Sequence, residues 1–157
     1  MSAKTNAIRL VEKAGIPYSE KFYEYSEDDL SGNHAAQVLG IPEEQVFKTL
    51  VARGERTGIN VFCVPVCCEL DLKKAAKAAG DKNMELIHVK ELLGLTGYIR
   101  GGCSPVGMKK KYPTYLDELC LLCDEIALSA GERGHQMIVP PEAIAQLVDA
   151  KIVDLTK

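Results

Sequence analysis

The chain has 157 residues, of which 46% are hydrophobic and 26% are charged, and its formal net charge is −3. A chain of this length and composition forms a globular domain that buries roughly two-thirds of the surface of the unfolded chain. No apolar run approaches the roughly 18 residues that span a membrane, and the amphipathic N-terminus lacks the apolar core of a secretion signal. We therefore expect a cytosolic protein without a membrane anchor.

The first third of the chain predicts a helix, a strand and a second helix. Apolar residues at helical spacing over 3–14, followed by Gly15, predict the first helix. The aromatic-rich stretch 18–25 predicts a strand. Asn33 is expected to cap a short helix that runs to Leu39.

The middle of the chain carries the clearest element signals. Two β-branched stretches, 46–53 and 59–66, are separated by a turn that contains two glycines and predict a β-hairpin. Asp71 is expected to cap a helix over 72–79, which Gly80 would end.

The remaining predicted elements are shorter and include both helices and strands. In chain order we expect a helix at 89–93, strands at 98–100, 125–129 and 136–139, a helix from Pro141 to Asp149, and a strand at 151–155. No internal repeat or low-complexity linker interrupts this order. The sequence therefore predicts one α+β domain over residues 1–157.

The six cysteines favour packing over metal binding or disulfides. Without a secretion signal, they are expected to be reduced thiols. Cys120 and Cys123 have the spacing of a zinc knuckle, but Cys67 and Cys68 are adjacent and do not supply a matching pair. We expect no metal and no cofactor.

A glycine-rich segment, Gly101-Gly102-Cys103-Ser104-Pro105-Val106-Gly107, is the strongest candidate for a binding loop. A phosphate-binding P-loop would need a lysine where Met108 stands. A nucleophile elbow around Ser104 would need an N–H from the next residue, which is Pro105 and has none. Two readings remain, a tight surface turn or a loop whose bare amides hold a polar ligand.

Lys48 is the second candidate, within a basic part of the chain. Between residues 48 and 111, Lys and Arg number 12 and Asp and Glu number 6. Strand alternation places Lys48 on one face with Val46 and Leu50. Its ammonium must therefore either reach past them to water or serve as a fixed cation at a pocket wall.

These features occur together, in one order, in a known family. The motifs are Phe47-Lys48-Thr49-Leu50, Leu70-Asp71-Leu72-Lys73-Lys74, Thr96-Gly97-Tyr98 through Lys110, and Ser129-Ala130-Gly131-Glu132-Arg133-Gly134. From about residue 23 to residue 154 the chain resembles the YbaK-type Cys-tRNA(Pro) deacylases. That family is related to the editing domain inserted in bacterial prolyl-tRNA synthetases.

The resemblance implies a fold, an activity and partners. The fold would be a mixed, strongly curved, barrel-like sheet flanked by helices. The activity would be removal of cysteine from mischarged tRNA(Pro). The synthetic site of the synthetase cannot exclude cysteine by size alone, because cysteine is close to proline in size. The substrate's own thiol would attack the ester carbonyl, and prolyl-tRNA synthetase is a possible partner.

The resemblance also assigns residues to roles. Lys48, Gly101 and Gly102 would hold the reacting ester and its developing charge. The expected substrate-binding residues are Tyr23, Cys103, Ser104, Pro105, Gly107 and Gln136, and the expected tRNA contacts are Lys73, Lys74, Lys109, Lys110 and Lys111.

Several positions leave alternatives open. Gln136 stands where some members have aspartate and cannot act as a base. Packing is favoured over catalysis for Cys103, and His135 is the histidine nearest the late glycine loop. An editor of Ala-tRNA(Pro) and a non-catalytic nucleotide-binding module are the competing functions. The alanine editors tend to have a Thr-Pro-Phe-Gly loop where this chain has Ser104-Pro105-Val106-Gly107.

Overall fold

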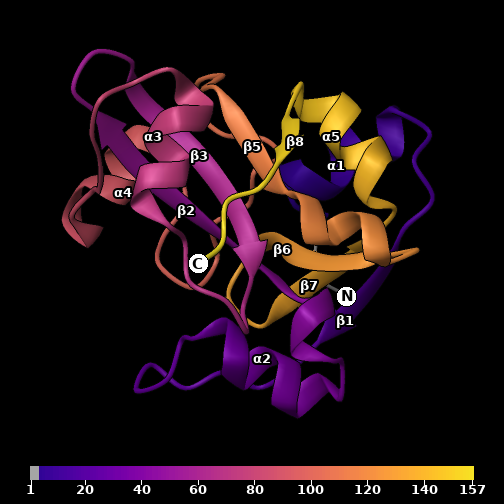
Figure 1. The fold of residues 1–157 in the computed structure, drawn as a ribbon. Coiled ribbons are helices and arrows are strands. Elements are labelled where there is room, and N and C mark those ends of the chain that lie inside the picture. The colour runs from indigo at the N-terminus through magenta and orange to yellow at the C-terminus, as the bar shows by residue number, and fades with distance from the viewer. Residues whose placement is uncertain (1–3) are drawn as a thin grey trace.

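A computed structural model describes residues 4–157, which form two open β-sheets surrounded by five α-helices (Figure 1). The three-stranded sheet has the order β1-β7-β6 and is antiparallel throughout. Its strands are β1 (Ser19–Phe22), β6 (Ile126–Glu132) and β7 (His135–Val139).

The second sheet has five strands in the order β4-β2-β3-β5-β8. Strand β2 pairs antiparallel with β3 and β4, whereas β5 pairs parallel with β3 and β8. The strands are β2 (Phe47–Gly54), β3 (Gly58–Pro65), β4 (Met84–Leu86), β5 (Thr114–Asp117) and β8 (Lys151–Val153).

The α+β class is confirmed, but the expectation of one strongly curved, barrel-like sheet is wrong. The strands divide into two open sheets, and an isolated parallel bridge between Val46 and Ala127 links them. The division follows from the pairing of β2, which forms a ladder with β3 along its whole length, whereas the bridge to β6 lies at Val46, the residue just before β2.

The helices cover the sheets on different sides. They are α1 (Asn6–Lys13), α2 (Gly32–Leu39), α3 (Leu72–Ala79), α4 (Val89–Thr96) and α5 (Pro141–Val148), with 3-10 turns η1 (Glu43–Gln45) and η2 (Glu118–Leu122). In Figure 1, α2 lies at the opposite end of the molecule from α1 and α5. Within residues 4–157, no helix is both long and apolar enough to cross a membrane.

Strand β2 contributes to two separate apolar cores. Phe47 packs in the core that α1 and α5 share with β6 and β7. Ala52, on the other face, packs in the core beneath α3. Burial on both faces fixes the strand firmly, because shifting its register would exchange the two faces.

Local signals predicted several boundaries correctly. Asp71 caps α3 by accepting the N–H groups of Lys73 and Lys74, at 2.9 and 3.1 Å. The predicted cap of α2 is wrong by two residues, because Ser31 Oγ accepts the His34 N–H at 3.2 Å. The Asn33 side chain instead donates to the Val66 carbonyl at 3.1 Å.

The second half of the chain departs more from the predicted elements. The expected strand at 98–100 is a turn, whose Tyr98 hydroxyl donates to the Val106 carbonyl. The strands β4 and β5 were not predicted, and both are short. Helix α4 is longer than the expected 89–93.

Candidate functional site

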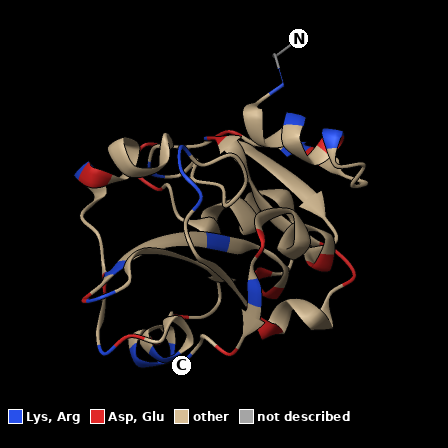
Figure 2. Ribbon diagram, turned by 90° about the horizontal axis from the view of Figure 1, so that it is seen from above, with Lys and Arg blue, Asp and Glu red and all other residues tan. Residues whose placement is uncertain are grey.

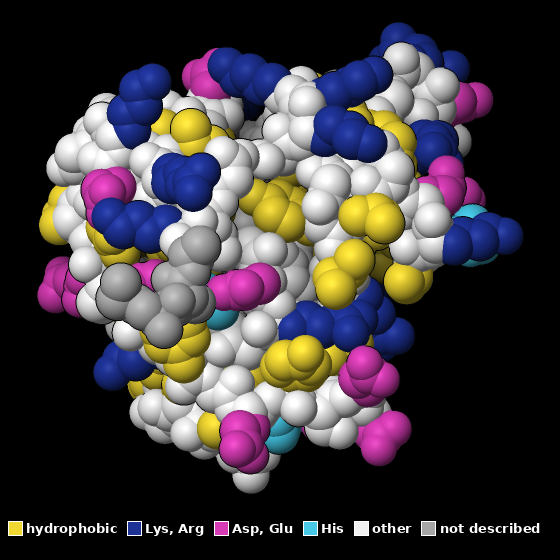
Figure 3. Space-filling model, turned by 180° about the vertical axis from the view of Figure 1, so that it is seen from behind, with side chains coloured by type: hydrophobic (Ala, Val, Ile, Leu, Met, Phe, Trp, Pro, Cys, Tyr) yellow, Lys and Arg dark blue, Asp and Glu magenta, His cyan; other side chains and the backbone are white. Residues whose placement is uncertain are grey.

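A pocket of about 380 Å³ opens where the two sheets meet. It is bordered by the start of α2, by β2, by the β4–α4 segment, by the glycine loop and by the three-stranded sheet. The pocket opens on the rear of the molecule as drawn in Figure 1. Figure 3 shows that face, where hydrophobic side chains gather beside lysine and arginine side chains around a hollow. The volume is within the usual range for small-ligand sites.

The charged side chains of the pocket wall are all cationic. Lys48 on β2 and Arg100 before the glycine loop line it, and no Asp or Glu does among residues 4–157. Lys48 is half-buried, and within the same residues no carboxylate lies within ion-pair distance of its ammonium. The pocket therefore favours a ligand that carries negative charge or develops it during reaction.

Among residues 4–157, the pocket wall holds no activated nucleophile. Burial raises the pKa of the Cys103 thiol to about 12, so it is protonated at neutral pH. The Ser129 hydroxyl accepts the Gly131 N–H at 3.1 Å, and no histidine or carboxylate lines the pocket within residues 4–157 to act as its base. Among those residues, no group of three or more His, Cys, Asp or Glu side chains could hold a metal ion.

The glycine loop turns only one end toward the pocket. Gly101 and Cys103 line it, whereas Gly102 does not. The Gly102 N–H donates to the Ile99 carbonyl at 2.9 Å and is therefore committed to the loop itself.

The other end of the loop is structural. Ser104 is fully buried, and its hydroxyl accepts the Val106 N–H at 3.2 Å. Gly107 lies beside α1, where its carbonyl accepts from the Asn6 side chain at 3.5 Å. Neither these two residues nor the buried Pro105 lines the pocket.

The late glycine loop at 129–134 packs against the first glycine loop at 101–107 and supports it. Arg133 Nε donates to the Arg100 carbonyl at 2.8 Å. Gly102 packs so closely that a Cβ there would lie 3.0 Å from the backbone of Glu132. The contacts of Glu132 and Arg133 with this loop thus stabilise the conformation of Gly101, whose φ is 88°.

This contact gives a prediction for stability. We expect Gly102→Ala to lower the free energy of unfolding by about 1–3 kcal/mol, because backbone must shift to admit the methyl group. Gly94→Ala is the matched control, since a Cβ there meets nothing within 4 Å and alanine favours the α4 helix by about 0.5–1 kcal/mol. Urea unfolding of both variants measures the difference, and equal stabilities would contradict the predicted contact.

Tyr23 and Gln136 both line the pocket and are neighbours there. Burial raises the pKa of the Tyr23 hydroxyl, and the neighbouring Gln136 amide and Gly134 backbone oppose this shift. Gln136 is 7% exposed, and its Oε1 is buried without a hydrogen-bond partner in residues 4–157. An acceptor left in this state requires a donor from a ligand or from water.

His135 lies outside the pocket lining. Its ring stacks on Phe22, with centroids 4.2 Å apart. Its two nitrogens lie 2.7 Å from Glu132 Oε2 and 3.0 Å from Glu20 Oε1. These contacts give it a structural role on the three-stranded sheet.

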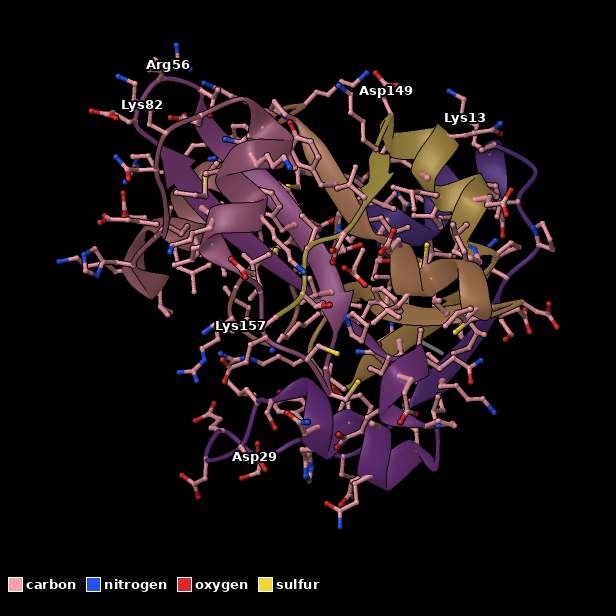
Figure 4. The ribbon with its side chains drawn as sticks, in the orientation of Figure 1. Lys13, Asp29, Arg56, Lys82, Asp149 and Lys157 are labelled. Carbon is pink, nitrogen blue, oxygen red and sulfur yellow. The ribbon has the colours of Figure 1, made fainter. Side chains whose placement is uncertain are left out.

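The lysines expected to contact tRNA do not line the pocket. Lys74 pairs with Asp154 at 2.9 Å, and Lys109 donates to the Gly94 carbonyl at 3.2 Å. Lys111 lies 3.6 Å from Asp149, which Figure 4 labels at the end of the molecule opposite α2. Figure 2 shows Lys and Arg residues and Asp and Glu residues spread over the ribbon.

Sequence reasoning missed part of the pocket wall. The missed residues are Arg100, Thr49, five residues before and within α2 (Leu30, Ser31, Gly32, Asn33 and Ala35), and four apolar residues (Leu86, Ile87, Val89 and Leu92). Arg100 directly precedes the glycine loop and could have been included on that ground. The apolar residues carried no signal apart from their helical spacing.

Comparisons with known proteins relate this chain to a family and to solved structures. The model of a family described as an aminoacyl-tRNA editing domain matches residues 31–147. An Enterococcus faecalis protein named "Putative Cys-tRNA(Pro)/Cys-tRNA(Cys) deacylase EbsC" is 50% identical over 98% of this chain and 93% of its own length.

Two solved structures share the fold. One, described as "Crystal structure of a putative trans-editing enzyme for prolyl tRNA synthetase", has a TM-score of 0.82 and 29% identity, with 99% of each chain covered. The other, described as "Crystal structure of hypothetical protein APE2540", has a TM-score of 0.88 at 20% identity and covers 98% of this chain and 100% of its own.

Proposed function

Because this chain belongs to the aminoacyl-tRNA editing domain family, we propose that it is a free-standing deacylase that removes cysteine from Cys-tRNA(Pro). The substrate is taken from the name of the relative with 50% identity, and action in trans from the description of the structure with a TM-score of 0.82. The observation that carries the proposal is a pocket with two cations and no activated nucleophile. Residues 1–157 would act as one editing domain in the cytosol.

The proposed reaction uses a nucleophile from the substrate. The cysteinyl thiol loses its proton to water, and its sulfur attacks the ester carbonyl carbon. The C–O bond to the ribose then breaks, and the ribose oxygen takes up a proton. The products are cysteine thiolactone and free tRNA, with no net oxidation.

The protein's part in this scheme is positioning and charge stabilisation. Lys48 would stabilise the negative charge on the thiolate and on the carbonyl oxygen. Gly101 and Cys103 line the pocket, and their main-chain N–H groups would provide amide donors for that oxygen. The Tyr23 hydroxyl and the unpartnered Gln136 Oε1 would hold the substrate's amino group.

The rest of the tRNA would be bound outside the pocket. Lys73 and Lys110 are exposed, and Lys74, Lys109 and Lys111 would exchange their present partners for phosphates. Such contacts weaken as salt concentration rises. A prolyl-tRNA synthetase partner would supply selectivity for tRNA(Pro).

A deacylation panel tests the proposed function. Purified protein is mixed with tRNA(Pro) carrying cysteine, alanine or serine, and with Cys-tRNA(Cys), and release of the amino acid is followed. We expect rapid release from both cysteinyl substrates and little from Ala-tRNA(Pro). Faster release of alanine would identify an alanine editor, and binding without release of any amino acid would identify a non-catalytic module.

A further inference from the structure

Part of the β2 edge points its main chain into the pocket. The Val66 N–H donates to the Val46 carbonyl at 2.8 Å, so even-numbered residues of β2 direct their polar groups toward β3. In an antiparallel ladder these directions alternate, so odd-numbered residues point away from β3. The bond from the Ile87 N–H to the Val51 carbonyl, 3.1 Å long on that other side, agrees. The N–H and C=O of Thr49 therefore face away from β3.

No strand covers this position. Strand β4 pairs with β2 only from Ala52 to Gly54, and the parallel bridge to Ala127 lies at Val46. Within residues 4–157, Thr49 pairs with Cys63 of β3 but has no strand partner on its other side, between the bridge and β4, and it lines the pocket. A main-chain donor and acceptor in such a place require a ligand or water.

The size of this gap restricts the ligand. The bridge to Ala127 lies at Val46, and the Ile87 N–H takes the Val51 carbonyl, so the open stretch of edge around Thr49 is short. An extended peptide adding to a sheet edge would need several free residues in a row. A short stretch of edge centred on the N–H and C=O of Thr49 instead suits a compact group with one adjacent donor and acceptor.

The walls beside the gap are apolar and aliphatic. Leu50, Leu86, Ile87, Val89 and Leu92 line this part of the pocket. Aliphatic walls with a polar edge at one side suit a flat heteroaromatic ring. Arg100 in the same pocket suits the phosphate of the nucleotide that carries such a ring.

We propose that the main-chain N–H and C=O of Thr49 bind the adenine base of the tRNA 3′ end. The adenine amino group donates to the Thr49 carbonyl, and an adjacent ring nitrogen accepts from the Thr49 N–H. The choice of adenine rests on the proposed function, because every tRNA that carries an amino acid ends in adenosine. The site holds the terminal nucleoside, while Lys48 and the glycine loop hold the ester.

A nucleotide series tests the base contact without any deacylation. AMP, IMP and N6,N6-dimethyl-AMP are titrated into the full-length protein, and binding is followed by calorimetry or NMR. IMP has a carbonyl acceptor in place of the amino group and an N–H donor in place of the adjacent ring nitrogen. N6,N6-dimethyl-AMP lacks the N–H donors of the amino group. We expect each to bind about tenfold more weakly than AMP. Equal binding of AMP and IMP would overturn the proposal.

A main-chain substitution tests the residue assignment. Replacing the Thr49 residue by its α-hydroxy acid through semisynthesis changes the N–H to an oxygen and keeps the side chain. We expect AMP affinity to fall about tenfold, with the preference over IMP lost. The same replacement at Glu142 is the control, because a first-turn amide of α5 has no partner within its helix.

The outcomes separate this proposal from the proposed function. Unchanged AMP affinity in the folded Thr49 ester variant would overturn the base contact, even if the protein deacylates Cys-tRNA(Pro). A clear AMP preference that depends on the Thr49 N–H would support the contact, even if no deacylation is found. Circular dichroism of both ester variants verifies that they are folded.

Discussion

Replacing Lys48 with alanine is expected to lower kcat/KM for Cys-tRNA(Pro) by about 100-fold or more. The ammonium faces a pocket that lacks carboxylates among residues 4–157, so its charge is available to the substrate. Its removal leaves the thiolate and the carbonyl oxygen without their nearest cation. Single-turnover deacylation measures the change, since product release then does not limit the rate.

The control for this experiment is Lys82→Ala. Lys82 is exposed at the end of the molecule where Figure 4 labels it beside Arg56, and it does not line the pocket. The Lys82→Ala substitution removes the same charge from the protein. A loss of activity that occurs only in Lys48→Ala must therefore arise in the pocket and not from the change in net charge. Lys48→Arg should recover part of the activity. A Lys48→Ala enzyme within about threefold of the wild type would remove Lys48 from the mechanism.

Cysteine on tRNA(Pro) is expected to react at least about 100-fold faster than serine on the same tRNA. The two differ only in the atom that attacks the ester, and a hydroxyl is almost entirely protonated where a thiol is partly ionised. The rate with cysteine should rise with pH and level off near the pKa of the substrate thiol, about 8.5 or below. Mass spectrometry of the products should detect cysteine thiolactone.

The pH profile distinguishes this route from attack by the protein. If Cys103 were the nucleophile, the rate would continue to rise toward pH 12, because burial raises its pKa to about 12. Cys103→Ala should therefore retain deacylation with the same pH profile. Equal rates for seryl and cysteinyl substrates would exclude the thiol-assisted route.

Local chemistry made much of the fold predictable. The Asp71 cap, the turn between β2 and β3, and the apolar stripe of α1 each arise from residues close together in sequence. The strand expected at 98–100 failed for the opposite reason. There the Tyr98 side chain bonds to Val106, and this contact within the glycine segment overrides strand propensity.

The division into two sheets depends on distant pairings and was not predictable. The position where β4 stops pairing with β2 decides where the pocket opens, and no residue of β2 signals it. The family resemblance did select Lys48, Gly101, Tyr23 and Gln136, which the structure brings to one pocket from separate segments. It could not reveal that Ser104 and Gly107 belong to the loop's structural end, because that depends on packing against α1 and on burial.

Strand β2 also limits how this protein can diversify. One face is held by the core under α3, the other by the core shared with α1 and α5, and its free edge opens into the pocket. A substitution in β2 therefore affects the packing of both cores and the binding of the ligand at the same time. Sequence changes should therefore be tolerated more readily at the exposed rim, around Leu86 and Val89, where they leave the cores intact. Relatives should diverge in sequence there while their β2 strands stay alike.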